Sequence, residues 1–350
     1  MEAHVSEIAV IGAGAWGTSL SIVLGRKGTH HVRLWAHEKK VLDSISSRQV
    51  NELFLPEHAI PDCVSVTGSF EEALHDAEIV VSVMPSQHCR DLFQKMRPFL
   101  KPDMLFVSAT KGLEEGTLLR MTEVIAVVVG SDGGFQPRIG ALSGPTFAKE
   151  VARGDPTAIA VASRDAALAE TVQREFGDPR FRVYTNTDVA GVELGGALKN
   201  IIAIAAGVCD GLGLGHNSIA ALITRGLAEI TRLVIACGGR QDTMSGLAGL
   251  GDLVLTCTGG LSRNRSVGVE LGRGRNLPEI TAAMHGMVAE GVFTTHAAVE
   301  LARSRRVEMP ITAQMDAILH HGKSPRDAIH ELMTRSAKSE SGFDPGGAAA

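Results

Sequence analysis

The chain has 350 residues, a length that favours two domains over one. Hydrophobic residues make up 44% and charged residues 21%, the balance of an ordinary globular protein and not of a disordered one. A formal charge of −5 argues against a protein that mainly coats nucleic acid or anionic membranes. Aromatic residues at 4% also disfavour a binder that stacks single-stranded bases.

The N-terminus, the hydropathy and the cysteines favour a cytoplasmic protein. Residues 1–7 lack a basic segment followed by an apolar run, and no stretch approaches the ~18 apolar residues of a membrane span. The five cysteines are odd in number and show no CxxC spacing. We therefore expect a chain without disulfides, structural zinc or other metal.

Strand-like and helix-like segments alternate through the first part of the chain. Apolar or β-branched runs predict strands at 7–11, 31–35, 79–83, 104–109, 139–142, 157–161 and 180–184. Helices are predicted at 16–26 and 39–47, and a glycine-rich surface loop at 130–134. Strands separated by helices are typical of a parallel, doubly wound sheet. The expected fold class is α/β, with a Rossmann-like N-terminal domain.

The pattern changes near residue 188. Helices are predicted at 189–208, 218–237, 262–272 and 292–303, with few β-branched runs between them. We predict a dinucleotide-binding domain at 1–188, an all-helical domain for substrate binding and catalysis at 189–338, and a flexible tail at 339–350.

A glycine motif follows the first predicted strand and opens the first predicted helix. Its residues are Gly12-Ala13-Gly14-Ala15-Trp16-Gly17. Gly12 suits the tight turn, Gly14 lets the backbone approach a pyrophosphate, and Gly17 lets the helix pack closely on the strand. The helix N-terminus adds amide donors and positive potential for phosphates. The alternative is a plain strand-to-helix turn.

The residues after the second predicted strand bear on the choice of cofactor. His37 is followed by Glu38, Lys39 and Lys40. The histidine and the lysines favour the 2′-phosphate of NADP, whereas Glu38 leaves NAD open. Lys39 and Lys40 would equally suit a solvated helix face.

Polar residues follow two further predicted strands, where a doubly wound sheet places its active site. Lys111 comes directly after one strand, and Ser143-Gly144-Pro145-Thr146-Phe147-Ala148 comes after another. The lysine would point into the crevice, and the irregular turn offers amides and the Thr146 hydroxyl to a polar substrate.

The first helix of the second half carries an unusual pair of glycines. Gly195 and Gly196 precede Lys199 and Asn200, and each interior glycine costs a helix about 1 kcal/mol against alanine. The glycines lie on the face of the lysine, so they suggest room for a ring or a small substrate. Tight packing of the helix is the alternative.

A fourth cluster suggests a phosphate site. Asp252 ends a glycine-rich segment, and Ser262, Arg263 and Asn264 open a predicted helix. An N-cap serine, helix amides and a guanidinium together bind phosphate. Taken alone, such a helix start is usually just a cap.

Together these blocks resemble the bacterial type of the NAD(P)-dependent glycerol-3-phosphate dehydrogenase family. The matching segments are GAGAWG, ATKG, SGPTFAKE, GGALKNIIAI, ALITRGLAE, GLAGLGDLVLTCT and SRNR, in order from about Ile8 to Lys323. The resemblance implies hydride transfer between a nicotinamide and C2 of dihydroxyacetone phosphate or glycerol 3-phosphate. It also implies supply of glycerol 3-phosphate for phospholipid synthesis.

The resemblance assigns roles residue by residue. Lys199 matches the general acid/base, Asp252 its acidic neighbour, and Lys111 a lysine that touches both cofactor and substrate. The implied substrate contacts are Lys111, Gly144, Thr146, Lys199, Asp252, Ser262, Arg263 and Asn264. The implied cofactor contacts are Gly12, Gly14, Ala15, Trp16, Gly17, His37, Lys111, Ala148, Arg263, Val288 and Glu290. Ala289 and the extra length near 130–138 depart from the family pattern.

Two other readings stay open at this point. A related two-domain dehydrogenase acting on a 3-hydroxy acid or a sugar-acid phosphate would share the glycine turn and the lysine-plus-asparagine helix. A cofactor sensor would keep the fold and lose polar site residues, yet Lys111, Lys199, Asp252 and Arg263 are present. A phosphorylated triose is the expected ligand, a homodimer a possible assembly, and no nucleic-acid partner is expected.

Overall fold

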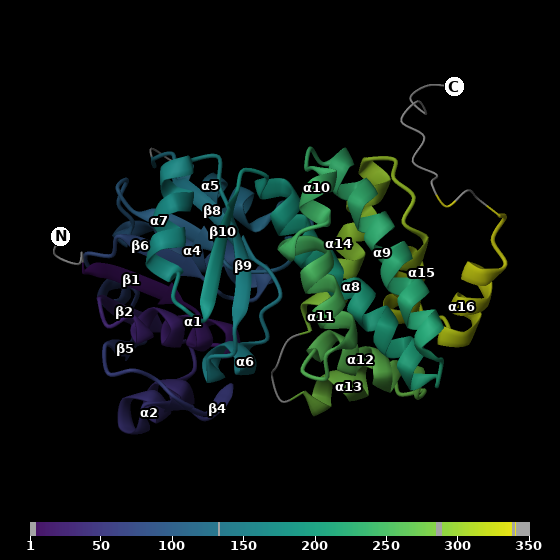
Figure 1. Ribbon diagram of the computed structural model, residues 1–350, viewed down its shortest axis with the longest axis horizontal. Helices are drawn as coiled ribbons and strands as arrows, with labels where there is room; N and C mark the ends of the chain where they lie inside the picture. Colours follow the sequence, from purple (N-terminus) through teal and green to yellow (C-terminus); the bar gives the residue numbers. More distant parts are fainter. Residues whose placement is uncertain (1–4, 132–133, 285–288, 338–339, 341–350) are drawn as a thin grey trace.

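The computed structural model describes residues 5–131, 134–284, 289–337 and 340. Figure 1 shows two parts side by side, a sheet flanked by helices and a mass of helices. The change from strands to helices falls between Asn186 and Val189. That residues 1–188 and 189–338 form separate domains stays a prediction, and all of the predicted tail except Glu340 lies outside the described residues.

An eight-stranded sheet forms the first part. Its strands are β1 (Ser6–Ile11), β2 (His30–Trp35), β5 (Val64–Thr67), β6 (Ile79–Ser82), β7 (Leu105–Ser108), β8 (Arg138–Ser143), β9 (Thr157–Ala162) and β10 (Phe181–Asn186). The spatial order is β10-β9-β8-β7-β6-β1-β2-β5, which places β1 and the start of the chain inside the sheet. A separate hairpin, β3 (Val50–Asn51) with β4 (Leu55–Ala59), was not predicted from the sequence.

The predicted α/β fold class with a Rossmann-like sheet is confirmed, and one strand pairing departs from the predicted parallel arrangement. β9 pairs antiparallel with β8, and β10 pairs parallel with β9, so the last two strands run against the other six. The helix between β8 and β9 is α6 (Ala148–Arg153), whose six residues span only ~9 Å before Gly154 ends it. A six-residue strand spans ~20 Å, so α6 is too short to carry the chain back to the end of the sheet where β8 begins. The next strand, β9, therefore starts near the end of β8 and runs antiparallel to it.

Helices cover both faces of the sheet (Figure 1). They are α1 (Ala15–Arg26), α2 (Lys39–Arg48), α3 (Phe70–Leu74), α4 (Cys89–Met96), α5 (Met121–Gly130), α6 and α7 (Ala166–Phe176). The side chains of neighbouring residues of β1 are buried on opposite faces of the sheet. Val10 belongs to the apolar cluster on one face, and Ile11 belongs to a second apolar cluster on the other face. Burial on both faces explains why the strands read as continuous apolar runs. Gly130, predicted as loop, is the last residue of α5.

The second part is helical, as predicted. Its elements are α8 (Val189–Gly211), α9 (His216–Ala236), α10 (Gln241–Met244), the π-helical turn η3 (Leu247–Gly251), α11 (Asp252–Thr258), α12 (Arg263–Gly272), α13 (Leu277–Ala283), α14 (Glu290–Ser304), α15 (Pro310–His320) and α16 (Pro325–Met333). α8 runs through the centre, and its Gly207 and Gly211 allow the backbone of α12 to approach closely.

One described helix, α8, is long and apolar enough to cross a membrane, and its apolar window is 100% buried inside the protein. The bent pair Gln241–Thr258 and Arg263–Gly272 passes the same test when counted as one span. A buried core helix satisfies this test by length and composition alone, and α8 occupies that position here.

Candidate active site

The glycine turn between β1 and α1 has the shape of a phosphate cradle. Gly12 adopts φ +121°, and a Cβ there would lie 2.4 Å from the Val83 carbonyl oxygen. A Cβ on Gly17 would lie 1.9 Å from the Gly12 carbonyl oxygen, whereas a Cβ on Gly14 would meet nothing within 4 Å. Gly12 and Gly17 therefore permit the turn and the close packing, and Gly14 faces open space at the helix N-terminus. This geometry fits a bound pyrophosphate.

Asn51 supports this turn and was not predicted from the sequence. Its buried side chain donates from Nδ2 to the Ala13 carbonyl oxygen (2.8 Å) and to Thr18 Oγ1 (2.9 Å). Asn51 lies in the β3–β4 hairpin, far from the motif in sequence. No local pattern could have linked it to the glycines.

Three predicted cofactor contacts follow the glycine turn or the end of β2 directly. Ala15 and Trp16 form the first turn of α1, and both are partly buried against the sheet. His37 is exposed just after β2, with its ring centroid 6.0 Å from that of Trp35. Lys39 and Lys40 open α2, and both are exposed.

Lys199, Lys111 and Asp252 form a buried cluster where the two parts meet. The Lys111 ammonium donates to Asp252 Oδ2 (2.7 Å) and to the Gly144 carbonyl oxygen (3.0 Å). The Lys199 ammonium donates to Asp252 Oδ1 and to Thr256 Oγ1, the latter at 2.6 Å. Asp252 thus holds two ammonium groups, one from the loop after β7 and one from α8.

The cluster adjusts the acidity of Lys199. Burial lowers the pKa of this ammonium from 10.5 to about 8, while the Asp252 carboxylate opposes the shift and the Lys111 charge adds to it. A group with a pKa near the working pH can both donate and accept a proton. Lys199 therefore has an acidity that suits proton transfer in either direction. Thr256, its second acceptor, was not singled out in the sequence.

Gly195 and Gly196 do not leave room for a ring, and this expectation was wrong. A Cβ on Gly195 would lie 2.7 Å from the Ala248 carbonyl oxygen, and one on Gly196 would lie 2.4 Å from Ser143 Oγ. The glycines let α8 pack directly on η3 and on the end of β8. Tight packing, the alternative reading, is what the structure shows.

The turn after β8 adds backbone groups to the cluster. Thr146 donates its hydroxyl to the Gly144 carbonyl oxygen (3.1 Å), the same oxygen that binds Lys111. A Cβ on Gly144 would lie 3.0 Å from the Cα of Ile159, so the turn is pressed against β9. Ala148 opens α6, and its carbonyl oxygen accepts from Ser19 of α1.

The predicted phosphate residues lie at the start of α12. The Ser262 hydroxyl accepts from the Arg265 amide (3.2 Å) and caps the helix. Arg263 is exposed, yet desolvation by the surrounding protein lowers the pKa of its guanidinium and the Glu290 charge opposes that shift. Asn264 accepts the Gly291 amide on Oδ1 (3.0 Å), which fixes the orientation of its side-chain amide.

Glu290 joins the two parts beside these residues. Its carboxylate accepts the Ser86 amide (3.2 Å) and the Ser86 hydroxyl (2.6 Å), and Ser86 lies just after β6. A Cβ on Gly112 would meet Ser86 Oγ at 2.5 Å and Glu290 Oε2 at 3.1 Å. Glu290 therefore lies close to the residue after Lys111. Val288 lies outside the described residues.

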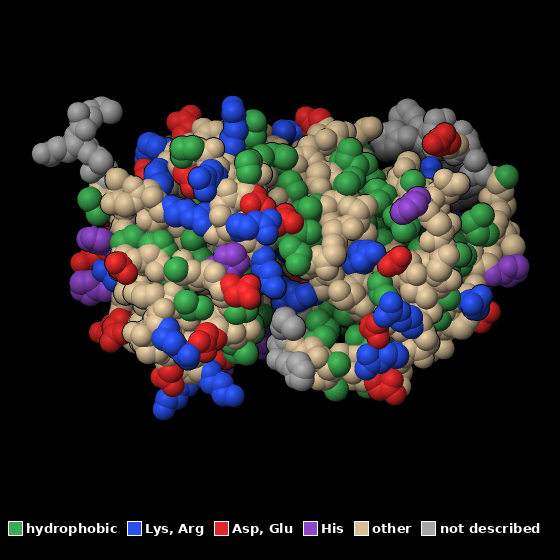
Figure 2. Space-filling model, turned by 60° about the horizontal axis from the view of Figure 1, so that its bottom comes forward, with side chains coloured by type: hydrophobic (Ala, Val, Ile, Leu, Met, Phe, Trp, Pro, Cys, Tyr) green, Lys and Arg blue, Asp and Glu red, His purple; other side chains and the backbone are tan. Residues whose placement is uncertain are grey.

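The contacts bring the predicted residues into one region. Lys111, Gly144, Lys199 and Asp252 form one hydrogen-bonded cluster, and Gly112 lies between this cluster and Glu290, whose charge acts on Arg263. Figure 2 shows a hollow between the two parts, with Lys and Arg side chains gathered beside it.

A sheet with a glycine cradle, joined to helices that supply a buried lysine–carboxylate cluster, defines the class of two-part dinucleotide-dependent dehydrogenases. Two family models match the chain: the NAD-dependent glycerol-3-phosphate dehydrogenase N-terminus over residues 7–169 and the C-terminus over residues 188–330. The chain belongs to the NAD-dependent glycerol-3-phosphate dehydrogenase family.

Individual relatives agree with the family models. A glycerol-3-phosphate dehydrogenase [NAD(P)+] of Koribacter versatilis is 70% identical over 336 residues, 96% of this chain and 99% of that protein. The corresponding protein of Acidobacterium capsulatum is 54% identical over 339 residues, 96% of this chain and 100% of that protein. The crystal structure of glycerol-3-phosphate dehydrogenase from Coxiella burnetii matches with a TM-score of 0.88 at 40% identity, covering 95% of this chain and 99% of that one.

Proposed function

We propose that this protein is an NAD(P)-dependent sn-glycerol-3-phosphate dehydrogenase in which Lys199 is the general acid/base. The supporting observation is the buried cluster in which Lys199 and Lys111 share Asp252 between the two parts of the molecule. The names of the relatives and the family models support the substrate and the cofactor class.

The residues of the N-terminal cradle fit a nicotinamide dinucleotide. Gly14 faces open space, and the first amides of α1 point out of the helix N-terminus toward it. When bound, the nicotinamide supplies or removes the hydride at C2 of the substrate. His37, with Lys39 and Lys40 nearby, favours the 2′-phosphate of NADP, and Glu38 leaves NAD open.

Lys199 handles the proton that accompanies this reaction. During reduction its ammonium donates a proton to the C2 oxygen of dihydroxyacetone phosphate, and during oxidation the neutral amine takes that proton back. Such proton transfer contributes typically ~10²–10⁴-fold to the rate. Asp252 orients the ammonium, and Lys111 stabilises negative charge that develops on the C2 oxygen.

The start of α12 binds the substrate phosphate in this proposal. Ser262, Arg263 and Asn264 supply a hydroxyl, a guanidinium and an oriented amide at a helix N-terminus. Gly144 and Thr146 complete the substrate contacts on the sheet side. Binding energy at the phosphate holds C2 in place, so an unphosphorylated ketone should react poorly.

The wider role proposed is supply of glycerol 3-phosphate for phospholipid synthesis in a bacterial cytoplasm. It follows from the reaction and from the bacterial relatives. A homodimer stays a prediction from the sequence.

The deciding experiment follows the absorbance of reduced nicotinamide with the purified protein. NADPH and NADH are each tested with dihydroxyacetone phosphate and with unphosphorylated dihydroxyacetone. Rapid turnover that requires the phosphate supports the substrate and its binding site, and the ratio of the two rates gives the cofactor preference. Binding of cofactor without turnover of either ketone would contradict the proposed substrate.

A further inference from the structure

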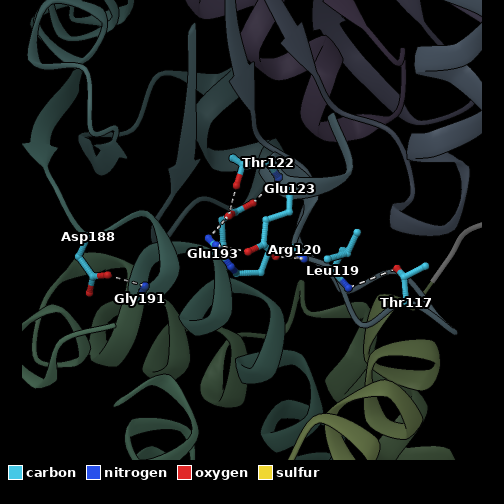
Figure 3. Close-up of polar contacts among 8 residues, drawn as sticks. All are labelled: Thr117, Leu119, Arg120, Thr122, Glu123, Asp188, Gly191 and Glu193. Atoms are coloured by element: carbon cyan, nitrogen blue, oxygen red, sulfur yellow. Dashed lines mark hydrogen bonds and ion pairs between the residues drawn. The ribbon is translucent and has the colours of Figure 1, made fainter. Parts of the chain in front are cut away.

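We propose that Glu193 is a positioning residue, which sets α8 and its Lys199 against the loop that carries Lys111. The proposal rests on the proposed function for its kinetic readout, and its geometry stands on contacts that involve no residue of the cofactor cradle. Figure 3 shows the carboxylate of Glu193 facing Arg120 and Thr122.

Glu193 makes three hydrogen bonds across the junction between the two parts. Its Oε1 accepts the Thr122 amide (2.9 Å), and its Oε2 accepts the Thr122 hydroxyl (2.5 Å) and the Arg120 guanidinium (2.8 Å). The residue is only 8% exposed. Burial raises the pKa of this carboxyl, and the Arg120 charge opposes the shift. The Thr122 amide lies in the first turn of α5, where the helix itself offers no acceptor, and the buried Glu193 carboxylate on α8 accepts its hydrogen bond instead.

The start of α5 is also one end of the Lys111 loop. Residues 109–120 connect β7 to α5, and within this segment Leu113 forms a β-bridge with Arg120. The Glu114 amide donates to the Leu119 carbonyl oxygen (3.0 Å), which closes the loop on itself. Leu113 is fully buried in the apolar cluster of the helical part, together with Leu194 and Leu198. Lys111 therefore sits two positions from a residue that is buried in the same apolar cluster as the side chains of α8.

The helix transmits this placement to the reacting lysine. Lys199 follows Glu193 by roughly 9 Å along α8, at ~1.5 Å per residue. The start of α8 is fixed as well, since Asp188 accepts the Gly191 amide (2.8 Å) and the Arg240 amide (2.8 Å). Lys199 and Lys111 meet on opposite oxygens of Asp252, so the position of α8 against the loop decides how the two ammonium groups are spaced.

The chain contains a matched control. Glu229 of α9 accepts the Ile311 amide (2.7 Å), the Thr312 amide (3.2 Å) and the Thr312 hydroxyl (3.3 Å) at the start of α15. Glu229 is 2% exposed. Like Glu193, it is a buried glutamate that accepts hydrogen bonds from the start of another helix, but both of its helices belong to the helical part. Replacing either glutamate by glutamine removes one buried carboxylate from a threonine-bearing helix start.

The test compares Glu193→Gln with Glu229→Gln and with the wild-type protein. We expect Glu193→Gln to bind cofactor normally and to lose at least about tenfold in kcat, since a ~1 Å misplacement can cost ~10²-fold. Three groups act on the acidity of Lys199: Asp252, Lys111 and Cys257. The Lys111 charge lowers the pKa of Lys199. Displacement of the loop that carries Lys111 should therefore move the midpoint of the pH profile of kcat/KM to higher pH. Glu229→Gln should keep kcat and the midpoint.

A second variant, Thr122→Val, tests the proposal even if Glu193→Gln fails to fold. Thr122→Val keeps the backbone amide of residue 122 and replaces the hydroxyl by a methyl group, so it should show the same changes as Glu193→Gln in smaller measure. A Glu193→Gln protein, or failing that a Thr122→Val protein, with wild-type kcat and midpoint would overturn the proposal. An equal loss of kcat in Glu229→Gln would also overturn it, because the effect would then be general destabilisation.

A readout without activity separates this proposal from the proposed function. Hydrogen exchange at the amides of residues 112–119 should quicken in Glu193→Gln and stay unchanged in Glu229→Gln. If the wild-type protein turns over no dihydroxyacetone phosphate, the proposed function fails while the exchange result still decides the role of Glu193. Unchanged exchange in Glu193→Gln would refute the anchoring of the loop.

Discussion

Lys199 and Asp252 form a buried ion pair although 53 positions separate them in the chain. The lysine comes from the central helix α8, and the carboxylate is the first residue of α11. Asp252 has no exposed surface, so its charge is balanced by the two ammonium groups that it accepts from. This pairing keeps a largely protonated amine in a desolvated site, which the proposed proton transfer requires.

Removing the lysine should abolish turnover and spare cofactor binding. Lys199→Ala leaves Asp252 paired with Lys111, and the glycine cradle is untouched. We expect a loss of ~10²–10⁴-fold in kcat for dihydroxyacetone phosphate reduction. Steady-state kinetics measures the loss, and fluorescence titration with reduced cofactor checks binding. Turnover at the wild-type rate would show that another group moves the proton.

The two directions of the reaction should respond oppositely to pH. Burial lowers the pKa of Lys199 to about 8, against the opposing Asp252 charge. Reduction needs the ammonium, so kcat/KM should be level below pH 8 and fall about tenfold per unit above it. Oxidation needs the neutral amine and should rise up to pH 8. Asp252→Asn removes the charge that raises this pKa, so its midpoint should move to lower pH.

A single added methyl group can test the cradle. Gly14→Ala places a Cβ in open space, so the protein should fold, but the methyl group would stand where the pyrophosphate approaches. We expect the cofactor Kd to rise about tenfold or more, equivalent to ~1.4 kcal/mol. Isothermal titration calorimetry measures this change.

Gly215→Ala is the matched control for the cradle. Gly215 also caps a helix N-terminus with nothing within 4 Å of a Cβ, and its φ of −77° resembles the −69° of Gly14. Both variants should lose about 0.5–1 kcal/mol of stability from the weaker cap. Cofactor affinity should change only in Gly14→Ala, and an unchanged Kd there would remove the cradle from the proposal.

Glu229 should make stability depend on pH. Burial raises its pKa from 4.5 to about 7, although the Ile311 and Thr312 amides oppose the shift. The pKa of Glu229 is higher in the folded protein than in the unfolded chain. Its contribution to the free energy of unfolding is therefore fully present below the unfolded-state pKa of 4.5 and is lost as the pH rises through the folded-state pKa of about 7. Between pH 4.5 and 8 the wild-type protein should lose roughly 3 kcal/mol more than Glu229→Gln. Urea unfolding at several pH values checks this, and parallel curves for the two proteins would contradict it.

Local sequence patterns predicted much of the fold because their causes are local. The turn at Gly12 needs a positive φ beside a short strand, and the apolar run of β1 reflects burial on both faces. The direction of β9 was predicted wrongly because it depends on how far α6 carries the chain, a property of the connection and not of the strand. Asn51 and Ser86 were missed because their partners, Ala13 and Glu290, lie in other segments.

The sequence by itself determined the change from alternating strands and helices to helices alone, the glycine cradle and the identity of the charged side chains at the site. Backbone torsion, periodic burial and side-chain chemistry act within a few residues, so their traces can be read along the chain. Only the tertiary structure decided that Lys111 and Lys199 share Asp252, and that Gly195 and Gly196 serve packing. Those outcomes depend on distances between elements, and such distances are set by the packing of α8 against the sheet.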